Sequence, residues 1–401
     1  MTKPETVATP PLPFAAKPAV KLGQFSARAA TIKEGWVAED DNEYRDVQRF
    51  RDGSPDYIPK RSDLATICKT SAGHLRAQRT AHDKAPAAGL NIQIIKHAAF
   101  LEPDKFRERI IQVPETSRKP ADWKKAKEAT ASKAFTCEFC GHVIEKGDKN
   151  LVLSAKRIHP ECIADAPADP WRDILADLEA RGLLVPGKTA ADLDASRNDA
   201  WYYVRRGWYL VKDSQLRTIE NIRQALAAHI IDGTDISALD LLSGRDDMRA
   251  AAEVSGYGMV DLVDVAVRPD ARFDKAPGQL IGARGWREGD GLIVDLKNSV
   301  SADPARWPFI CRDYWYHLQP AIYCDVAANI DGRDYRFLWV VVENEYPHAV
   351  SVIEPSPEDF ERGRKAYRKS LQKYSAAMSS GVWPMYPTAI TMTTTAPIRG
   401  E

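Results

Sequence analysis

An aspartate and a lysine one residue apart, at the end of a short apolar run, have the clearest chemical potential in this sequence. The run occupies residues 292–294, and Asp295 and Lys297 follow it. Its β-branched residues, a glycine before it and polar residues after it indicate a buried strand. Residues two apart on a strand point to the same face, so Asp295 and Lys297 are expected to project together toward a divalent metal and the water it activates. An ordinary solvated strand end has the same pattern, because 28% of the chain is charged.

A second carboxylate, Asp270, ends the sequence Arg268-Pro269-Asp270 after an apolar run at 263–267. We expect strands at 259–268 and 292–297 to be neighbours joined by a glycine-rich hairpin, so that Asp270 and Asp295 converge on one metal. Mg²⁺ takes few protein carboxylates and keeps sites for water and phosphate oxygens. It polarises a scissile phosphate, while Lys297 orients the attacking water or steadies the developing charge. This layout resembles that of the PD-(D/E)xK nuclease core, with Asp in the second acidic position.

Two close pairs of soft ligands form the strongest local signal. Cys137 and Cys140 are followed about twenty residues later by His159 and Cys162, a spacing that suits tetrahedral Zn²⁺. Four protein ligands leave no open position, which predicts a structural rather than a catalytic zinc. His142 is a competitor for the place of His159. The stretch resembles treble-clef fingers of the LIM or PARP type, which bind DNA, bind protein or brace a fold.

Composition sets the bounds for these sites. A chain of 401 residues with 44% hydrophobic content is long enough for two or three modest domains, or for one core with an inserted module. Lys+Arg and Asp+Glu both number 56, so any DNA site must be a local patch. The basic stretch 115–133 and the aromatic stretch 201–209 are candidates for such a patch, with a solvated helix and a packed core as the alternatives. No signal peptide or membrane span is evident, which predicts a cytoplasmic protein with reduced or metal-bound cysteines.

The remaining elements are expected from periodicity and capping signals. Ser62 is the expected N-cap of a helix from 63, and Thr70-Ser71 of a second helix. His97 lies on a helix at 92–101 that Pro103 ends, where a lone histidine is more often packed than a ligand. The other expected elements are helices at 171–182, 214–231, 304–329 (kinked at Pro320) and 357–377, and strands at 335–343 and 349–353.

Several segments, in order, resemble the RecE-type exonucleases (exodeoxyribonuclease VIII), a phage-derived branch of the PD-(D/E)xK superfamily. The resemblance covers roughly residues 58–125 and 213–390. The segments are Ser62-Asp63-Leu64 with Ser71-Ala72-Gly73-His74-Leu75, His97-Ala98-Ala99-Phe100-Leu101-Glu102-Pro103, Glu253-Val254-Ser255, Arg268-Pro269-Asp270, Asp295-Leu296-Lys297, Tyr316-His317-Leu318-Gln319 with Tyr323, and Trp383-Pro384 to Pro387. The chain departs from the family at Gln93, where a glycine is usual, and at Pro320, which interrupts the Gln-x-x-x-Tyr helix.

The resemblance implies a role for each matching residue. Lys297 serves the attacking water, and Gln319 and Tyr323 position the substrate. The implied ligands of Mg²⁺ (or Mn²⁺) are His97, Asp270, Asp295 and the backbone carbonyl of Leu296, with Glu253 as a further candidate. The resemblance also implies degradation of 5′-ended strands at double-stranded DNA ends, a single-strand annealing recombinase as partner, and a homo-oligomeric ring, a tetramer.

The predicted fold is an α/β PD-(D/E)xK core, restriction-endonuclease-like, with a mixed sheet flanked by helices and a small inserted zinc module. The predicted domains are a flexible leader at 1–55, a helical part of the nuclease domain at 56–130, the zinc module and linker at 131–212, the nuclease core at 213–390 and a tail at 391–401. The predicted function is an Mg²⁺-dependent exonuclease acting on duplex ends.

Three other functions remain open. The first is an endonuclease on the same core, targeted to DNA by the zinc module. The second is an inactive DNA- or protein-binding module, against which the full set of His97, Asp270, Asp295 and Lys297 argues. The third is a nuclease with an iron–sulfur cluster, which the grouping of the cysteines and the histidine ligand disfavour.

Overall fold

The computed structural model describes residues 35–38, 58–80, 88–115, 127–137, 140, 142–153, 156–164, 169, 171–197, 200, 203–205, 207–245, 248 and 251–386. The expected tail lies outside these residues. So does the expected leader, apart from residues 35–38, where the structure has a strand, β1 (Gly35–Val37), within the segment expected to be flexible. Residues 116–126 of the basic stretch also lie outside the described residues. The next residues form a strand, β3 (Lys127–Thr130), and not a helix.

A five-stranded mixed sheet forms the centre of the molecule, in the order β15-β14-β13-β12-β9. Its long middle strands, β13 and β14, are parallel, and every other neighbouring pair is antiparallel. The strands are β9 (Ala251–Ala252), β12 (Ala271–Phe273), β13 (Gly291–Ser299), β14 (Tyr335–Glu343) and β15 (Val350–Ile353). The strands predicted at 292–297, 335–343 and 349–353 are therefore confirmed.

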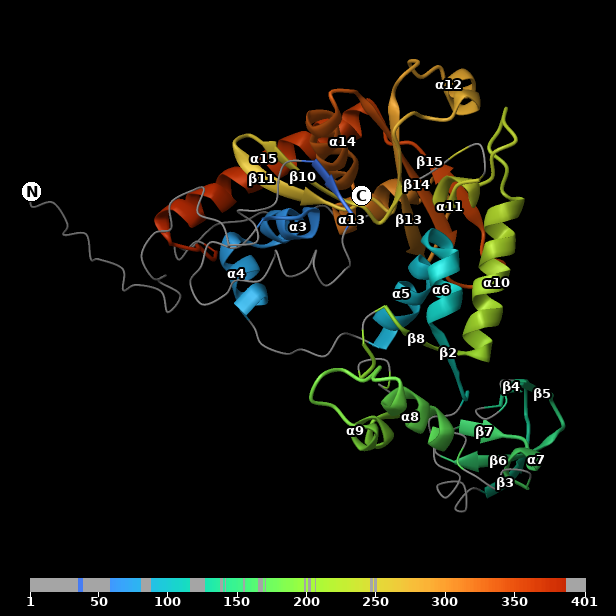
Figure 1. Ribbon diagram of the computed structural model, residues 1–401. Helices are drawn as coiled ribbons and strands as arrows, with labels where there is room; N and C mark the ends of the chain where they lie inside the picture. Colours follow the sequence, from blue (N-terminus) through green and yellow to red (C-terminus); the bar gives the residue numbers. More distant parts are fainter. Residues whose placement is uncertain are drawn as a thin grey trace, which may run out of the picture.

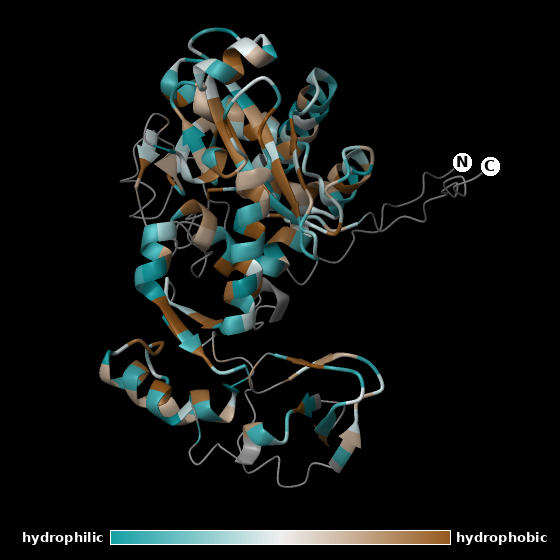
Figure 2. Cartoon of the chain, turned by 90° about the vertical axis from the view of Figure 1, so that its right-hand side faces the viewer, coloured by the Kyte–Doolittle hydropathy of each residue, from teal (hydrophilic) through white to brown (hydrophobic). Residues whose placement is uncertain are grey.

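Both faces of this sheet are buried, which explains why its strands are nearly continuous apolar runs. Ile293 and Trp339 belong to one hydrophobic core, packed with α3, α14 and α15. Leu296 and Val340 belong to a second core on the opposite face, with α5, α10 and α11. Figure 1 shows these two groups of helices on opposite sides of the sheet, and Figure 2 shows the hydrophobic strands between more polar helices.

The helices of the core keep the order expected from the sequence. They are α3 (Arg61–Lys69), α4 (Ala72–Thr80), α5 (Ala88–Leu101), α6 (Pro103–Arg109), α10 (Asp213–Ala228), α11 (Asp240–Ser243), α12 (Gly278–Arg284), α13 (Trp307–Tyr314), α14 (Leu318–Asp331) and α15 (Pro357–Ser380). The N-cap of α3 is Lys60 and not Ser62, because the Asp63 carboxylate accepts a hydrogen bond from the Lys60 amide, 2.8 Å away. Ser71 does accept from the His74 amide at the start of α4, 3.2 Å away.

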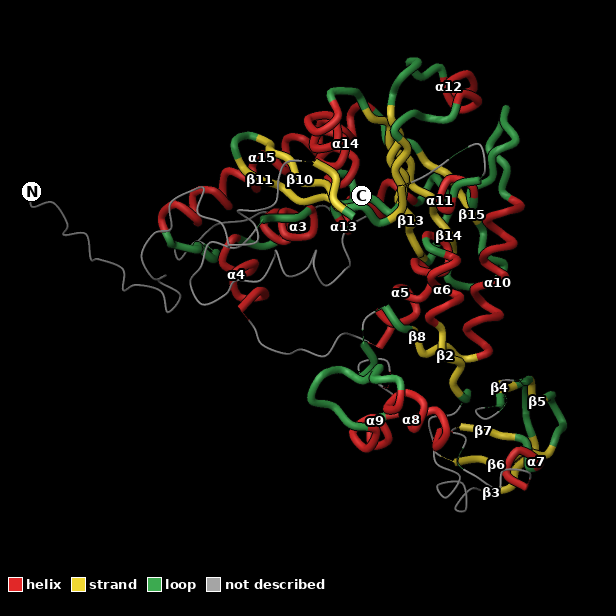
Figure 3. Tube along the Cα trace, in the orientation of Figure 1, coloured by secondary structure: helices red, strands yellow, loops and turns green. Residues whose placement is uncertain are grey.

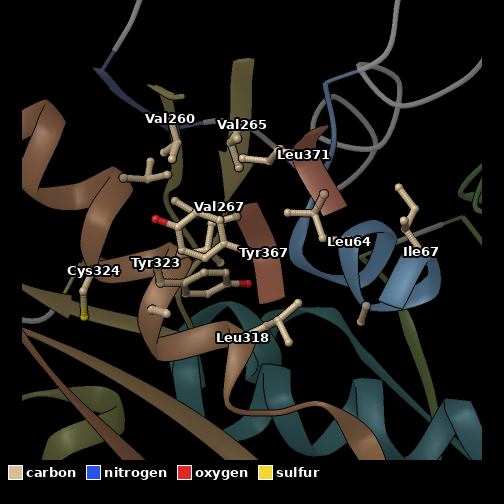
Figure 4. Packing of buried hydrophobic residues seen from close by; sticks show 14 of the residues in the cluster. Leu64, Ile67, Val260, Val265, Val267, Leu318, Tyr323, Cys324, Tyr367 and Leu371 are labelled. Atoms are coloured by element: carbon tan, nitrogen blue, oxygen red, sulfur yellow. The ribbon is translucent and has the colours of Figure 1, made fainter. Parts of the chain in front are cut away.

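The strand expected at 259–268 is a hairpin in the structure. Its strands are β10 (Ser255–Val260) and β11 (Val263–Val267), which pair in a small separate sheet with β1. Asp261 and Leu262 form the turn, and both have positive φ. This hairpin packs its valines against α3, α14 and α15 (Figure 4). The glycine-rich hairpin expected after Asp270 is instead β12 followed by α12, because only three residues pair before the chain turns into the helix.

The long helix expected at 304–329 is two helices, α13 and α14. The break falls at Trp315, whose φ of 57° ends α13, and not at Pro320. Pro320 lies in the first turn of α14, where its missing N–H has no helical acceptor to lose. The predicted kink is therefore wrong, and the proline lies in the first turn of the helix that carries Gln319.

The zinc-ligand region lies on a separate part of the chain, reached through a parallel pair of strands, β2 (Ile110–Val113) and β8 (Tyr209–Lys212). Figure 3 shows this part below the central sheet. Besides β3, its elements are β4 (Phe135–Thr136), β5 (Val143–Ile144), β6 (Lys149–Leu153), β7 (Lys156–Ile158), α7 (Glu161–Ala164), α8 (Trp171–Ala180) and α9 (Ala190–Ala195). Tyr203 and Trp208 of the aromatic stretch pack against a small core there with α8, which favours the packed-core alternative for these two residues. Among the described residues, no helix is long and apolar enough to span a membrane.

Candidate active site and candidate zinc site

Strand β12 places Asp270 beside Asp295. Asp270 directly precedes β12, whose Ala271 pairs with Val294 of β13 in the antiparallel register. The Asp270 carboxylate accepts a hydrogen bond from the Leu296 amide, 2.7 Å away, and both groups are buried. The expectation that the strand at 259–268 neighbours the one at 292–297 was wrong, because β11 belongs to a different sheet. The two acids still meet, through the short strand that follows Asp270.

The Asp295 carboxylate is held by two donors. Lys297 Nζ donates to one of its oxygens, and Gln319 Nε2 donates to the other. Lys297 lies two residues along the same strand, and Gln319 comes from the first turn of α14. Asp295 is 2% exposed. Its negative charge is therefore stabilised by these two donors and not by water. A buried carboxylate requires such partners.

His97 and Glu253 lie next to Asp270. His97 Nδ1, on α5, is 3.7 Å from Asp270 Oδ2. One ligand atom from each of His97, Glu253 and Asp270 lies within 4.8 Å of the other two, as a shared metal ion requires. This donor set of one imidazole and two carboxylates fits a hard divalent cation that also takes oxygen ligands from substrate. Asp295 lies outside this group, because its oxygens face Lys297 and Gln319.

Glu253 is held in a costly backbone conformation. Its φ is 53°, in the left-handed region that is unfavourable for a residue with a Cβ, at a cost of about 1 kcal/mol or more. Arg268 Nε donates to its carboxylate across 2.7 Å, and the Glu253 amide donates to the Asp270 carbonyl across 3.2 Å. Sequence reasoning alone left Glu253 as a doubtful ligand, and the structure places its carboxylate in the same group as His97 and Asp270.

Burial sets the proton affinities at the site. Burial lowers the pKa of Lys297 to about 7, while Asp270 acts to raise it and Arg61 to lower it further. Burial also lowers the pKa of His97, against the opposing effect of Asp270. At neutral pH, His97 is therefore neutral, as a metal ligand must be, and a large fraction of Lys297 is neutral and able to accept a proton.

Tyr323 lies one turn beyond Gln319 on α14 and is buried. Burial raises its pKa to about 12, with the Asp270 charge adding to the effect. Its ring belongs to the core beside Leu318 (Figure 4). Tyr323 therefore remains a protonated hydroxyl near the acids. The Leu296 side chain points into the opposite core, and its carbonyl as a metal ligand stays a prediction.

The structure adds Arg61 and Tyr316 to this neighbourhood. Arg61, the first residue of α3, donates to the Tyr314 and Trp315 carbonyls across 3.0 Å each. Its guanidinium carbon and Lys297 Nζ each lie 5.1 Å from the centre of the Tyr316 ring. No spacing in the sequence links Arg61 to Lys297, since the two are joined only by the packing of α3 against the end of α13.

The second candidate site consists of Cys137, Cys140, His159 and Cys162. One ligand atom from each lies within 4.8 Å of the others. Cys137 Sγ and Cys162 Sγ are 3.9 Å apart, and Cys140 Sγ is 3.4 Å from His159 Nδ1. Tetrahedral zinc with Zn–S bonds of about 2.3 Å separates its sulfur ligands by about 3.8 Å, so the four residues fit this ion.

His159 rather than His142 completes the set. The carbonyl of His142 accepts from the Cys137 amide, 2.8 Å away, and its side chain is exposed. His142 thus shapes the turn around the first cysteine pair. The expected grouping of the four ligands in space is found in the structure.

Comparison with known proteins bears on the core. Residues 287–394 match a family model described as "PDDEXK-like domain of unknown function (DUF3799)". The matched span contains Asp295 and Lys297. A crystal structure described as "Putative exonuclease" from Eubacterium rectale is similar at 12% sequence identity and a TM-score of 0.33, over 56% of this chain and 76% of that chain. No curated protein matches the sequence.

Over residues 287–394 the family match and the mixed α/β sheet indicate a PDDEXK-like domain, which agrees with the predicted fold class. The acids and lysine of that motif lie together where Asp270, just before β12, meets β13. These observations support a nuclease.

Proposed function

We propose that this protein is an Mg²⁺-dependent deoxyribonuclease that hydrolyses phosphodiesters from the ends of duplex DNA. The observation that carries the proposal is the meeting of two groups where β12 pairs with β13. His97, Glu253 and Asp270 form a ligand set, and the buried Asp295–Lys297 pair lies directly beside it. A group of partly buried ligands beside a buried lysine whose pKa is lowered is typical of functional sites.

The chain's residues have separable roles in this proposal. His97, Glu253 and Asp270 would hold the ion, with Asp295 and the Leu296 carbonyl as further candidate ligands. When bound, Mg²⁺ would polarise the scissile phosphate and lower the pKa of a water molecule. Lys297 would accept a proton from the attacking water or steady the charge that develops.

Gln319 and Tyr323 would position the substrate and the acids. The Gln319 amide fixes the Asp295 carboxylate through a hydrogen bond, so that Asp295 and Lys297 keep one orientation. Tyr323 would stay a hydrogen-bond donor, since its pKa of about 12 keeps the hydroxyl protonated.

Three finer features rest on the RecE-type resemblance. They are degradation of the 5′-ended strand, action with a single-strand annealing recombinase, and assembly into a ring around DNA, a tetramer. We propose a structural Zn²⁺ for Cys137, Cys140, His159 and Cys162, supported by the sulfur separation of 3.9 Å.

The direct test compares an end-labelled linear duplex with a covalently closed circle, in Mg²⁺ and in EDTA. Wild-type protein should degrade only the linear DNA, and only with Mg²⁺. The acids that flank β12 give a matched pair of variants. Asp270→Asn should abolish cleavage, whereas Asp274→Asn should leave it intact, because the Asp274 side chain is 69% exposed beyond the other end of the strand. Cutting of the circle would establish an endonuclease instead, and binding without cleavage would establish an inactive DNA-binding protein.

A further inference from the structure

A stack of three aromatic rings leads from Lys297 to the surface. Trp307 and Tyr316 have ring centres 5.7 Å apart and planes 24° apart, and Tyr316 and Tyr314 have centres 5.4 Å apart and planes 17° apart. We name these three rings the ring ladder. Trp307 is buried, whereas Tyr314 is 57% exposed. The ladder therefore begins in the core beside the candidate active site and ends in solvent.

Positively charged side chains lie beside two rings of the ladder. Lys297 and Arg61 both lie over the Tyr316 ring, and Lys69 Nζ lies 5.5 Å from the centre of the Tyr314 ring. Lys69 ends α3 and Arg61 begins it, so one helix supplies cations to two successive rings. Among the described residues, Arg61 Nε is buried and has no hydrogen-bond partner, which leaves this cation with unused donor capacity.

The backbone at the end of α13 fixes this arrangement. Trp315 has a φ of 57°, and the turn that it makes places Tyr314 and Tyr316 in one stack. Arg61 donates to the carbonyls of Tyr314 and Trp315 and so ties this turn to α3. These bonds hold the backbone of the turn, while the Tyr314 ring stacks on Tyr316 and the residue stays 57% exposed, which leaves an aromatic surface open to a ligand.

We propose that the ring ladder is the binding site for unpaired nucleotides of the DNA strand at the candidate active site. An exposed ring offers a surface on which a base stacks, and neighbouring cations neutralise the phosphates. Unpaired bases suit this chemistry better than paired ones, because bases inside a duplex are already stacked on both faces. Tyr314 takes a base, and Lys69 takes a phosphate. The proposal rests on the nuclease function and specifies the form of its substrate.

The test measures binding separately from cleavage, in an Asp295→Asn background with Mg²⁺. Fluorescence anisotropy reports the affinity for a labelled short oligothymidylate and for a blunt duplex of equal length. Tyr314→Ala should weaken single-strand binding by between about 5-fold and 150-fold, the range for losing one stacking aromatic, and should change duplex binding less. Tyr314→Phe keeps the ring and should bind like the parent.

Matched variants exclude general effects. Phe309 lies on the same helix and is 52% exposed, but it is outside the ladder, so Phe309→Ala should leave single-strand binding unchanged. Lys69→Ala should reduce the slope of log affinity against log salt by about 0.7, whereas Lys275→Ala, on an exposed loop, should not. Thermal unfolding of each variant checks that the fold is kept.

The ladder proposal is overturned if Tyr314→Ala binds the oligothymidylate like the parent, if Phe309→Ala or Tyr314→Phe weakens binding as much, or if duplex binding falls equally. Cleavage of linear duplex by the wild-type chain is measured beside these assays. If the wild-type protein cleaves DNA and Tyr314→Ala binds like the parent, the ladder proposal is rejected and the nuclease proposal is kept. If the wild-type protein does not cleave DNA but Tyr314→Ala binds the single strand more weakly, the nuclease proposal is rejected and the single-strand binding site is kept.

Discussion

Lys297 has two properties that conflict in an ordinary protein core. It neutralises Asp295, yet burial lowers its pKa to about 7, so its charged form is costly. Structural ion pairs are more often exposed, because desolvation offsets their attraction. The position is best explained by chemistry that needs a lysine able to lose its proton near neutral pH.

Replacing Lys297 tests its part in cleavage. We expect Lys297→Met to reduce kcat for linear duplex cleavage by about 10²–10⁴-fold, the usual contribution of a proton-transfer group. The free energy of unfolding should also fall, by up to about 3–5 kcal/mol, since the buried Asp295 carboxylate loses its cation and keeps only the Gln319 amide; kcat is therefore compared at a temperature where unfolding shows the variant to be folded. The measurements are steady-state kinetics and thermal unfolding, with the exposed Lys275→Met as control. Retained activity in Lys297→Met would remove the lysine from the mechanism.

Glu253 makes a second prediction at this scale. Glu253→Gln keeps the side-chain shape and an acceptor for Arg268 but loses the charge. If Glu253 holds the metal with His97 and Asp270, the Mg²⁺ concentration for half-maximal activity should rise about 10–100-fold, while activity at saturating Mg²⁺ falls less. The readout is a Mg²⁺ titration of cleavage. The control is Glu288→Gln, an exposed acid on the loop before β13. An unchanged titration would mean that Glu253 serves only its ion pair with Arg268.

At the scale of elements, the contact between α14 and α15 positions Gln319. α15 begins with the Ser356 hydroxyl accepting from the Asp359 amide, 3.1 Å away, and ends at Gly381 with a φ of 71°. Where the two helices cross, Gly363 lies directly against the His317 carbonyl, and a Cβ there would collide with that backbone atom. Gln319 follows His317 by two residues. The close contact with α15 therefore determines the position of Gln319, which donates a hydrogen bond to Asp295.

We therefore expect Gly363→Ala to lower stability by about 1–3 kcal/mol through overpacking and to reduce cleavage by shifting the start of α14. A matched substitution is Gly282→Ala on α12, where an added Cβ meets nothing within 4 Å. That change should be neutral or stabilise by up to about 1 kcal/mol, because alanine favours a helix. Thermal unfolding of both variants gives the comparison. Equal effects would show that the α14–α15 contact can relax.

At the scale of the whole molecule, the chain leaves the core through β2 and returns through β8, and these two strands pair with each other. The chain between them has its own small cores, one around Trp171 and one around the cysteines. The second of these contains few residues. A cluster of that size is too small to fold without added stabilisation, which bound zinc would supply.

Loss of one ligand should therefore unfold the module and spare the core. Cys162→Ser should lose zinc by metal analysis and become sensitive to protease within residues 127–164, while Mg²⁺-dependent cleavage of a linear duplex persists. The control is Cys68→Ser, because Cys68 lies on α3 in contact with Ser370. This variant should keep its zinc. Zinc retained in Cys162→Ser would contradict the proposed site. Loss of cleavage together with zinc would give the module a part in DNA binding.

Sequence reasoning reached the candidate site but not its complete geometry. Asp295 and Lys297 were predictable because they are two apart on a strand, where the period is fixed. Asp270 was assigned to the site through a strand neighbour that the structure does not have. Pro320 was taken as a kink, because a pattern of side chains does not reveal that α13 ends at Trp315 through a positive φ. Arg61 was not predicted, because it has no spacing relation to the residues that it meets.

The sequence by itself determined the local parts of this protein. The apolar runs of β13 and β14, the helices α5, α10 and α15 and the grouping of the zinc ligands follow from short-range periodicity, capping and spacing, which act within a few residues. Only the tertiary structure decided which parts meet. The pairing of β12 with β13, the approach of His97 and Glu253 to Asp270, and the position of Arg61 over the Tyr316 ring join residues from about twenty to more than two hundred positions apart. Such contacts depend on how buried faces pack together.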